Sequence, residues 1–293
     1  SADFEKSKKK YSAELSKING KKAEIKSEAE STKIVDELNN PSLEFKVDKI
    51  TKKNSVKKPQ PPFITSTLQR EASNKLSYGV SKTMQIAQKL YEGIDIGNDG
   101  PTGLITYMRT DSVRISDDAR DAAKEFILRN YGEKYYPEKP NVYTKGNSKQ
   151  VQDAHEAIRP TYIDKTPESV KKFLTSEQFR LYKLIWERFA ASQCANAQVE
   201  NTSVDIVADK YTFRVGASKL NFDGFMKVYT DTEDVEEYSE LPDFKQGEVQ
   251  TLKKVNPKQH FTQPPPRFSE ATLVKALEEY GIGRPSTYAP IIS

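Results

Sequence analysis

The stretch KPQPPF, from Lys58 to Phe63, divides the sequence into two kinds of pattern. Its three prolines cannot continue a regular strand or helix. Residues before it alternate between apolar and polar, as at Tyr11, Ala13 and Leu15, whereas residues after it place apolar side chains at helical spacing. The pattern therefore predicts a β-rich segment that ends near residue 63, followed by a helical segment.

The first β-rich segment carries two local signals. Asn19 and Gly20 follow the first alternating run, and both accept the positive φ angles of a tight hairpin turn. Ser27 and Glu30 have the spacing of a capping box, which predicts the start of a helix. We therefore expect a hairpin and one helix among the strands of this segment.

The helical segment is predicted to span residues 64–195. Ser116 precedes two acidic residues and has the character of an N-cap, and Pro167 suits a first helical position. Thr175 and Gln178 form a second capping box. These signals mark the starts of three separate helices.

Apolar and polar residues alternate again after residue 195, as at Val204, Ile206, Phe213 and Val215. We predict a mixed α and β, multidomain chain in which residues 1–63 and 196–262 form one β-rich domain. Residues 64–195 would interrupt that domain as a mostly helical one, and the two halves of the sheet would pair with each other.

The last section, residues 263–293, contains one predicted helix. Ser269 is its expected N-cap and Gly281 its end. The helix is predicted to bury Leu273, Val274, Leu277 and Tyr280. We expect these residues to be the truncated start of a further helical domain.

The composition excludes few classes of protein. The 293 residues carry a net charge of +4, from 46 basic and 42 acidic residues, which argues only weakly for a polyanionic partner. No apolar run approaches the ~18 residues that a membrane span needs. The single cysteine, Cys194, and the lack of a signal-peptide pattern favour the cytoplasm.

Tyr107 is a candidate nucleophile because Arg109 lies two residues after it. On an extended segment both side chains point to the same face, and the arginine fork matches two phosphate oxygens. A free tyrosine hydroxyl, with a pKa of about 10, needs such help before it can attack a phosphodiester. Alternatively, Tyr107 is a core aromatic on a strand, and Arg109 is a surface partner of Asp111.

The motif HEAIR places His155 four residues before Arg159. It lacks the second histidine of a zinc-protease helix, and neither Cys194 nor His260 completes a metal cluster, so we predict no metal site. On one helical turn, His155 and Arg159 would both reach a phosphate. The alternative is a histidine that caps a helix.

A third motif, GIGRPST, offers Arg284, Ser286 and Thr287 as contacts for a phosphate backbone. It is not a nucleotide-binding P-loop, because no Lys-Ser/Thr pair follows the glycines. We therefore expect no ATP site.

The stretches GLITYMRTDS, AHEAIRPT and PPPRFSEATLVKALEEYGIGRPSTYA, in this order, resemble the type IA DNA topoisomerase family. The methionine at position 108 resembles the bacterial topoisomerase I branch of the family, whereas topoisomerase III more often has a proline at this position. The resemblance implies a toroidal enzyme that cleaves one DNA strand through a 5′-phosphotyrosine, passes a strand and reseals the cut without ATP. Negatively supercoiled and single-stranded DNA would be its substrates.

The resemblance also assigns roles and domains. Tyr107 would be the nucleophile and Arg109 would position the scissile phosphate. His155 would order the DNA, and Arg284, Ser286 and Thr287 would bind the single strand. Residues 1–63 and 196–262 would form the arch domain (II), residues 64–195 the tyrosine domain (III), and residues 263–293 part of domain IV.

The sequence departs from the family in one respect. The family binds magnesium through an N-terminal Toprim domain, and no Asp-x-Asp motif of that kind occurs here. We therefore expect magnesium only in the intact enzyme, a monomer associated with the bacterial nucleoid, and an inactive chain when it is alone. The alternatives are a non-catalytic module that binds single-stranded DNA, or topoisomerase III.

Overall fold

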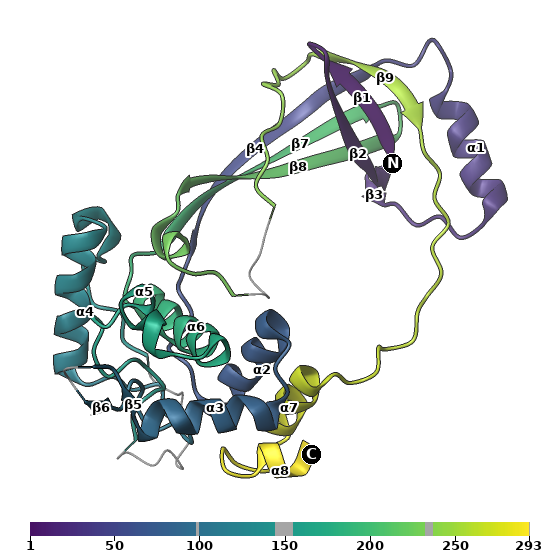
Figure 1. The fold of residues 1–293 in the computed structure, drawn as a ribbon. Helices are drawn as coiled ribbons and strands as arrows, with labels where there is room; N and C mark the ends of the chain where they lie inside the picture. Colours follow the sequence, from purple (N-terminus) through teal and green to yellow (C-terminus); the bar gives the residue numbers. More distant parts are fainter. Residues whose placement is uncertain (98–99, 144–154, 232–236, 293) are drawn as a thin grey trace. The chain divides into compact units, whose positions relative to one another are not determined.

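The computed structural model describes residues 1–97, 100–143, 155–231 and 237–292 (Figure 1). The chain forms two compact units, and each is composed of three separate segments of sequence. Unit 1 contains Ser1–Val56, Gln198–Phe222 and Glu236–Pro265. Unit 2 contains Lys57–Ala197, Asp223–Val235 and Pro266–Ser293.

Unit 1 contains a seven-stranded sheet with the order β1-β9-β4-β7-β8-β2-β3. Its strands are β1 (Ala2–Lys6), β2 (Lys9–Ile18), β3 (Lys21–Lys22), β4 (Phe45–Lys57), β7 (Ala197–Ala208), β8 (Tyr211–Phe222) and β9 (Val249–Val255). Strands β1 and β2 also pair with each other, so six of the strands form a closed ring of pairings. Leu15 of β2 lies opposite Phe213 of β8. The two β-rich segments of the sequence therefore share one sheet, as predicted.

The predicted turn and helix start of the first segment are confirmed, although the Glu30 carboxylate accepts a hydrogen bond from the Lys26 amide and not from that of Ser27. Asn19 and Gly20 adopt φ angles of 50° and 75° in the turn between β2 and β3. The Ser27 side chain accepts a hydrogen bond from the Glu30 amide at the start of α1 (Glu28–Leu38). The core of unit 1 includes Phe4, Phe45 and Phe213, whose ring centroids lie 5.4 to 6.0 Å apart.

Unit 2 is mainly helical, with two short strands. Its helices are α2 (Thr65–Leu76), α3 (Val80–Glu92), α4 (Asp117–Asn130), α5 (Pro167–Val170), α6 (Ser176–Ser192), α7 (Glu270–Glu279) and α8 (Tyr288–Ile292). Strands β5 (Ile94–Asp95) and β6 (Pro101–Thr102) form a short hairpin. Ser116, Thr166, Thr175 and Ser269 each accept a hydrogen bond from a first-turn amide, which confirms the predicted helix starts.

Helix α7 packs against α2 within unit 2. Its Glu270 also accepts a hydrogen bond of 2.7 Å from the Val80 amide, at the N-terminus of α3. Ala271 and Val274 form the buried face, whereas Tyr280 is 79% exposed. The prediction that Tyr280 is buried is wrong, because the helix ends at Glu279 and Tyr280 caps it beyond the packed face.

The segment Asp223–Val235 belongs to unit 2, although the sequence pattern grouped residues 196–262 together as strands. Tyr229 donates a hydrogen bond of 2.7 Å to Glu71 of α2, and Asp231 forms an ion pair with Arg188 of α6. Pro266–Ser293 also packs in unit 2. How these units correspond to the domains II, III and IV of the resemblance stays a prediction.

Within the part of the chain that the structure describes, every helix is too short or too polar to pass through a lipid bilayer.

Candidate active site

Tyr107 lies in unit 2, on an irregular segment that follows β6. The Tyr107 side chain is 37% exposed and Arg109 is also exposed, whereas Met108 and Thr110 are 0% and 1% exposed. Tyr107 and Arg109 therefore project outward from the same side of a segment that is buried on its other side. The alternative of a core aromatic on a strand is wrong for Tyr107.

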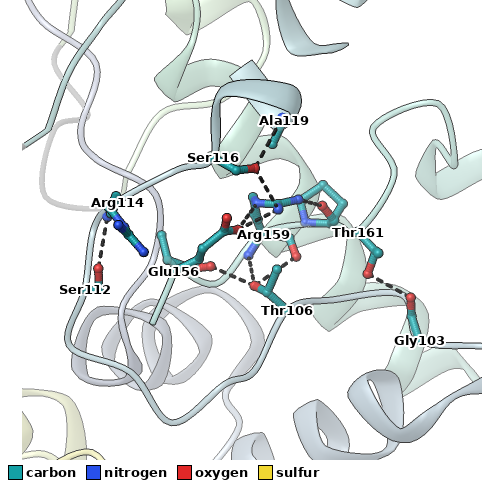
Figure 2. A network of polar contacts seen from close by, with 11 residues as sticks. Gly103, Thr106, Ser112, Arg114, Ser116, Ala119, Glu156, Arg159 and Thr161 are labelled. Atoms are coloured by element: carbon teal, nitrogen blue, oxygen red, sulfur yellow. Dashed lines mark hydrogen bonds and ion pairs between the residues drawn. The ribbon is translucent and has the colours of Figure 1, made fainter. Parts of the chain in front are cut away.

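One side of this segment pairs with residues 157–161 (Figure 2). The Thr106 amide donates to the Arg159 carbonyl at 2.9 Å, and its hydroxyl donates to the Ala157 carbonyl at 2.7 Å. The Arg159 amide in turn donates to the Thr106 hydroxyl at 3.0 Å. These bonds fix the backbone of the residue that directly precedes Tyr107.

Thr65, the first residue of α2, holds the other end of the segment. Its fully buried hydroxyl oxygen lies 2.8 Å from the Met108 carbonyl oxygen and 3.0 Å from that of Thr110. The same oxygen accepts a hydrogen bond of 2.9 Å from the Thr110 amide. Hydrogen bonds thus hold the backbone on both sides of Arg109. The arginine side chain is therefore exposed on a segment whose backbone is well anchored.

Two rings flank the Tyr107 ring. The centroid of the Tyr91 ring lies 5.4 Å away at an interplanar angle of 67°, and that of His155 lies 5.9 Å away at 52°. Among the described residues, neither the Tyr107 hydroxyl nor the Arg109 guanidinium has a hydrogen-bond or ion-pair partner. A nucleophile oxygen and a phosphate-binding fork are therefore both available to a ligand.

The prediction that His155 and Arg159 share a helical turn is wrong. Residues 155–160 are extended, and Ile158 and Pro160 form isolated bridges with Phe63 and Ile105. Pro160 disfavours helical angles at Arg159, and the Ile158 amide donates to the Phe63 carbonyl at 2.8 Å. The alternative of a helix-capping histidine stays a prediction, because residues 144–154, which directly precede His155, lie outside the residues that the structure describes.

Arg159 makes contacts within its own unit, as Figure 2 shows. Its guanidinium donates to Glu156 at 2.8 and 2.5 Å, to the Pro160 carbonyl at 3.0 Å and to the Ser116 hydroxyl at 3.4 Å. The side chain is 12% exposed. These contacts give Arg159 a structural role at the N-terminus of α4, while its contact with DNA stays a prediction.

The third motif forms a tight turn before α8. The Arg284 amide donates to the Thr287 hydroxyl at 2.8 Å, and the Thr287 amide donates to the Arg284 carbonyl at 2.8 Å. Arg284, Ser286 and Thr287 are exposed. Arg284 also lines a pocket of about 110 Å³ together with Thr110 and Asp111. The fold thus brings the third motif beside the segment that carries Tyr107.

Comparison with known proteins decides the family. A family model described as DNA topoisomerase matches residues 1–293. The chain belongs to the DNA topoisomerase family. It is 48% identical over 291 residues to DNA topoisomerase 1 of Rickettsia felis. This match covers 97% of this chain and 37% of the relative.

A solved structure supports the same assignment. Full-length topoisomerase I from Thermotoga maritima matches with a TM-score of 0.77 and 39% identity, over 94% of this chain and 43% of that one. These matches confirm the resemblance to bacterial type IA topoisomerases that the sequence motifs indicated. The chain spans 37% of the length of the curated topoisomerase that it matches.

The described residues of this topoisomerase chain do not fit a magnesium site. Within residues 1–97, 100–143, 155–231 and 237–292, three or more His, Cys, Asp or Glu side chains nowhere gather in a group that could hold a metal ion. We therefore assign no metal ligand among these residues and derive no step through a metal.

Other side chains are weaker nucleophile candidates than Tyr107. Burial raises the pKa of the Cys194 thiol to about 12, so the reactive thiolate is absent at neutral pH. Burial also raises the pKa of Tyr143, Tyr182 and Tyr229. Tyr91, Tyr162 and Tyr280 are exposed, but only Tyr107 is followed two residues later by an exposed arginine.

Sequence reasoning did not find Tyr91, Thr65 or Thr106. Tyr91 lies 16 positions before Tyr107 in an ordinary amphipathic helix, and no local pattern distinguishes it from a surface tyrosine. The hydroxyl contacts of Thr65 with residues 108 and 110 bridge distant parts of the sequence. Only the folded chain reveals such contacts.

Proposed function

We propose that this chain is part of a bacterial type IA DNA topoisomerase, an isomerase that relaxes negatively supercoiled DNA without ATP. One observation carries the proposal. Tyr107 is 37% exposed and its hydroxyl has no hydrogen-bond partner among the described residues, and it lies beside the similarly available Arg109 and the His155 ring. Family membership supplies DNA as the substrate class.

The proposed reaction exchanges one phosphodiester for another. The Tyr107 oxygen loses its proton to solvent and attacks phosphorus. The bond from phosphorus to the 3′ oxygen breaks, and this oxygen takes up a proton from solvent. The downstream strand stays attached to the protein through its 5′ phosphate, and the upstream strand leaves with a free 3′ hydroxyl. Attack by that hydroxyl after strand passage reverses the step, so no energy from ATP is required.

Arg109 has the main electrostatic role in this reaction. Negative charge grows on the non-bridging oxygens during attack, and a guanidinium can donate two hydrogen bonds to them. We propose that His155 orders the strand beside the tyrosine, and that Arg159, Arg284, Ser286 and Thr287 contact its backbone.

Further proposals concern the whole enzyme. Magnesium would be held by an additional Toprim domain, as the resemblance to the family implies. The intact enzyme would act as a monomer in the bacterial cytoplasm, associated with the nucleoid. The sheet of unit 1 would belong to the arch of the family.

Plasmid relaxation tests the proposed function. The full-length protein should relax a negatively supercoiled plasmid with magnesium and without ATP, whereas residues 1–293 alone should not. Relaxation by the isolated chain that the Tyr107→Phe control abolishes would show that no further domain is needed. Binding of single-stranded DNA by the full-length protein without any nicking would favour the non-catalytic module.

Replacing His155 by alanine should weaken strand binding about 3- to 10-fold, because a positioned imidazole would no longer contact the backbone. The dependence of affinity on salt should also become shallower. Fluorescence anisotropy with a labelled single strand measures the affinity and its dependence on salt, and wild-type affinity of the His155→Ala variant would exclude this role.

A further inference from the structure

Tyr91 lies in the last turn of α3 and belongs to none of the three motifs. Its side chain is 41% exposed, and its ring packs edge-on against the Tyr107 ring at 5.4 Å. Among the residues that the structure describes, Tyr91 and His155 are the two rings in contact with Tyr107. The hydroxyl of Tyr107 provides no further anchor in the described residues.

The backbone holds Tyr91 in this place. The Leu104 amide donates a hydrogen bond of 2.8 Å to the Leu90 carbonyl, and Leu90 is fully buried. A Cβ atom at Gly103 would lie 2.8 Å from the Tyr91 carbonyl oxygen, so glycine permits this close approach. The end of α3 is therefore fixed against the segment that leads to Tyr107.

The two flanking rings limit where the Tyr107 ring can go. An exposed tyrosine without a hydrogen bond would otherwise populate several rotamers, and ordering it costs free energy. An edge-to-face contact with Tyr91 favours one of these orientations. Attack on phosphorus requires the oxygen to be aligned with the leaving group, so a restricted ring favours reaction.

We propose that Tyr91 is a positioning residue, whose ring orients Tyr107 for attack and for resealing. This inference rests on the proposed function of Tyr107. We attribute the effect to the ring of Tyr91 and not to its hydroxyl, because within the described residues Tyr91 contacts Tyr107 only through its ring. Tyr91 touches neither the reacting atoms nor a strand in this role.

Single-turnover cleavage of a labelled single strand by the full-length protein tests the inference. Tyr91→Ala should lower the rate of cleavage about tenfold, with strand affinity and thermal unfolding temperature close to wild type. Tyr91→Phe should restore the rate, and Tyr91→Leu should not, because leucine fills space without offering an aromatic edge. Tyr162→Ala is the matched control, since Tyr162 is 57% exposed and has no ring contact with Tyr107.

Three results would overturn the inference. The first is a wild-type rate for Tyr91→Ala. The second is a loss in Tyr91→Phe equal to that in Tyr91→Ala, which would assign the effect to the hydroxyl. The third is an equal loss in Tyr162→Ala. Tyr107→Phe measured in parallel separates the two proposals, because an adduct formed by that variant would refute the proposed function itself.

Discussion

Replacing Tyr107 by phenylalanine should abolish the covalent adduct between protein and DNA, with a decrease of more than about 10⁴-fold. The hydroxyl oxygen is the proposed nucleophile, and phenylalanine offers none. The ring contacts with Tyr91 and His155 would remain, and the hydroxyl has no hydrogen bond to lose in the described residues. Folding and strand affinity should therefore stay close to wild type.

A denaturing gel of an end-labelled strand measures this loss directly. Tyr162→Phe is a suitable control, because it removes the hydroxyl of another exposed tyrosine in unit 2. An adduct at wild-type yield in Tyr107→Phe would refute the assignment of the nucleophile.

Replacing Arg109 by alanine should slow cleavage and resealing by about 10² to 10³-fold, which corresponds to roughly 3 to 4 kcal/mol of transition-state stabilisation. The guanidinium has no partner among the described residues, so its removal leaves no group unpaired and should not change stability. Arg109→Lys keeps the charge without the planar fork, and its rate should be intermediate.

Rapid-quench measurements of the rates of cleavage and resealing test this role of Arg109. Arg114→Ala is the matched control, because Arg114 is another exposed arginine five positions along the same segment. A similar loss in both alanine variants would mean that Arg109 acts only through the general charge of this surface.

The features that sequence reasoning predicted well are local. The helix starts at Ser116, Thr175 and Ser269 depend on hydrogen bonds to amides within three residues, so their chemistry can be recognised in a short window. Strand alternation also predicted that distant segments share a sheet. It did not predict the position of β9 between β1 and β4, because strand order depends on contacts between residues far apart in sequence.

In the candidate site, too, contacts between residues far apart in sequence could not be predicted. The motifs identified Tyr107, Arg109 and His155 as candidates, but helical spacing was the wrong geometry for the HEAIR motif. The partner of Ile158 is Phe63, which lies 95 positions earlier, and this pairing favours an extended backbone. The position of Tyr91 against Tyr107 depends on close packing at Gly103 and was equally unpredictable from the motif itself.

Peptide mapping of the trapped adduct tests the central claim most directly. The full-length protein would be incubated with a single strand labelled at its 3′ end, denatured, digested with protease and examined by mass spectrometry. We predict a nucleotide joined through its 5′ phosphate to the peptide that contains Tyr107, with the 3′ label retained on the protein. Attachment at another residue, or retention of a 5′ label instead, would contradict the claim.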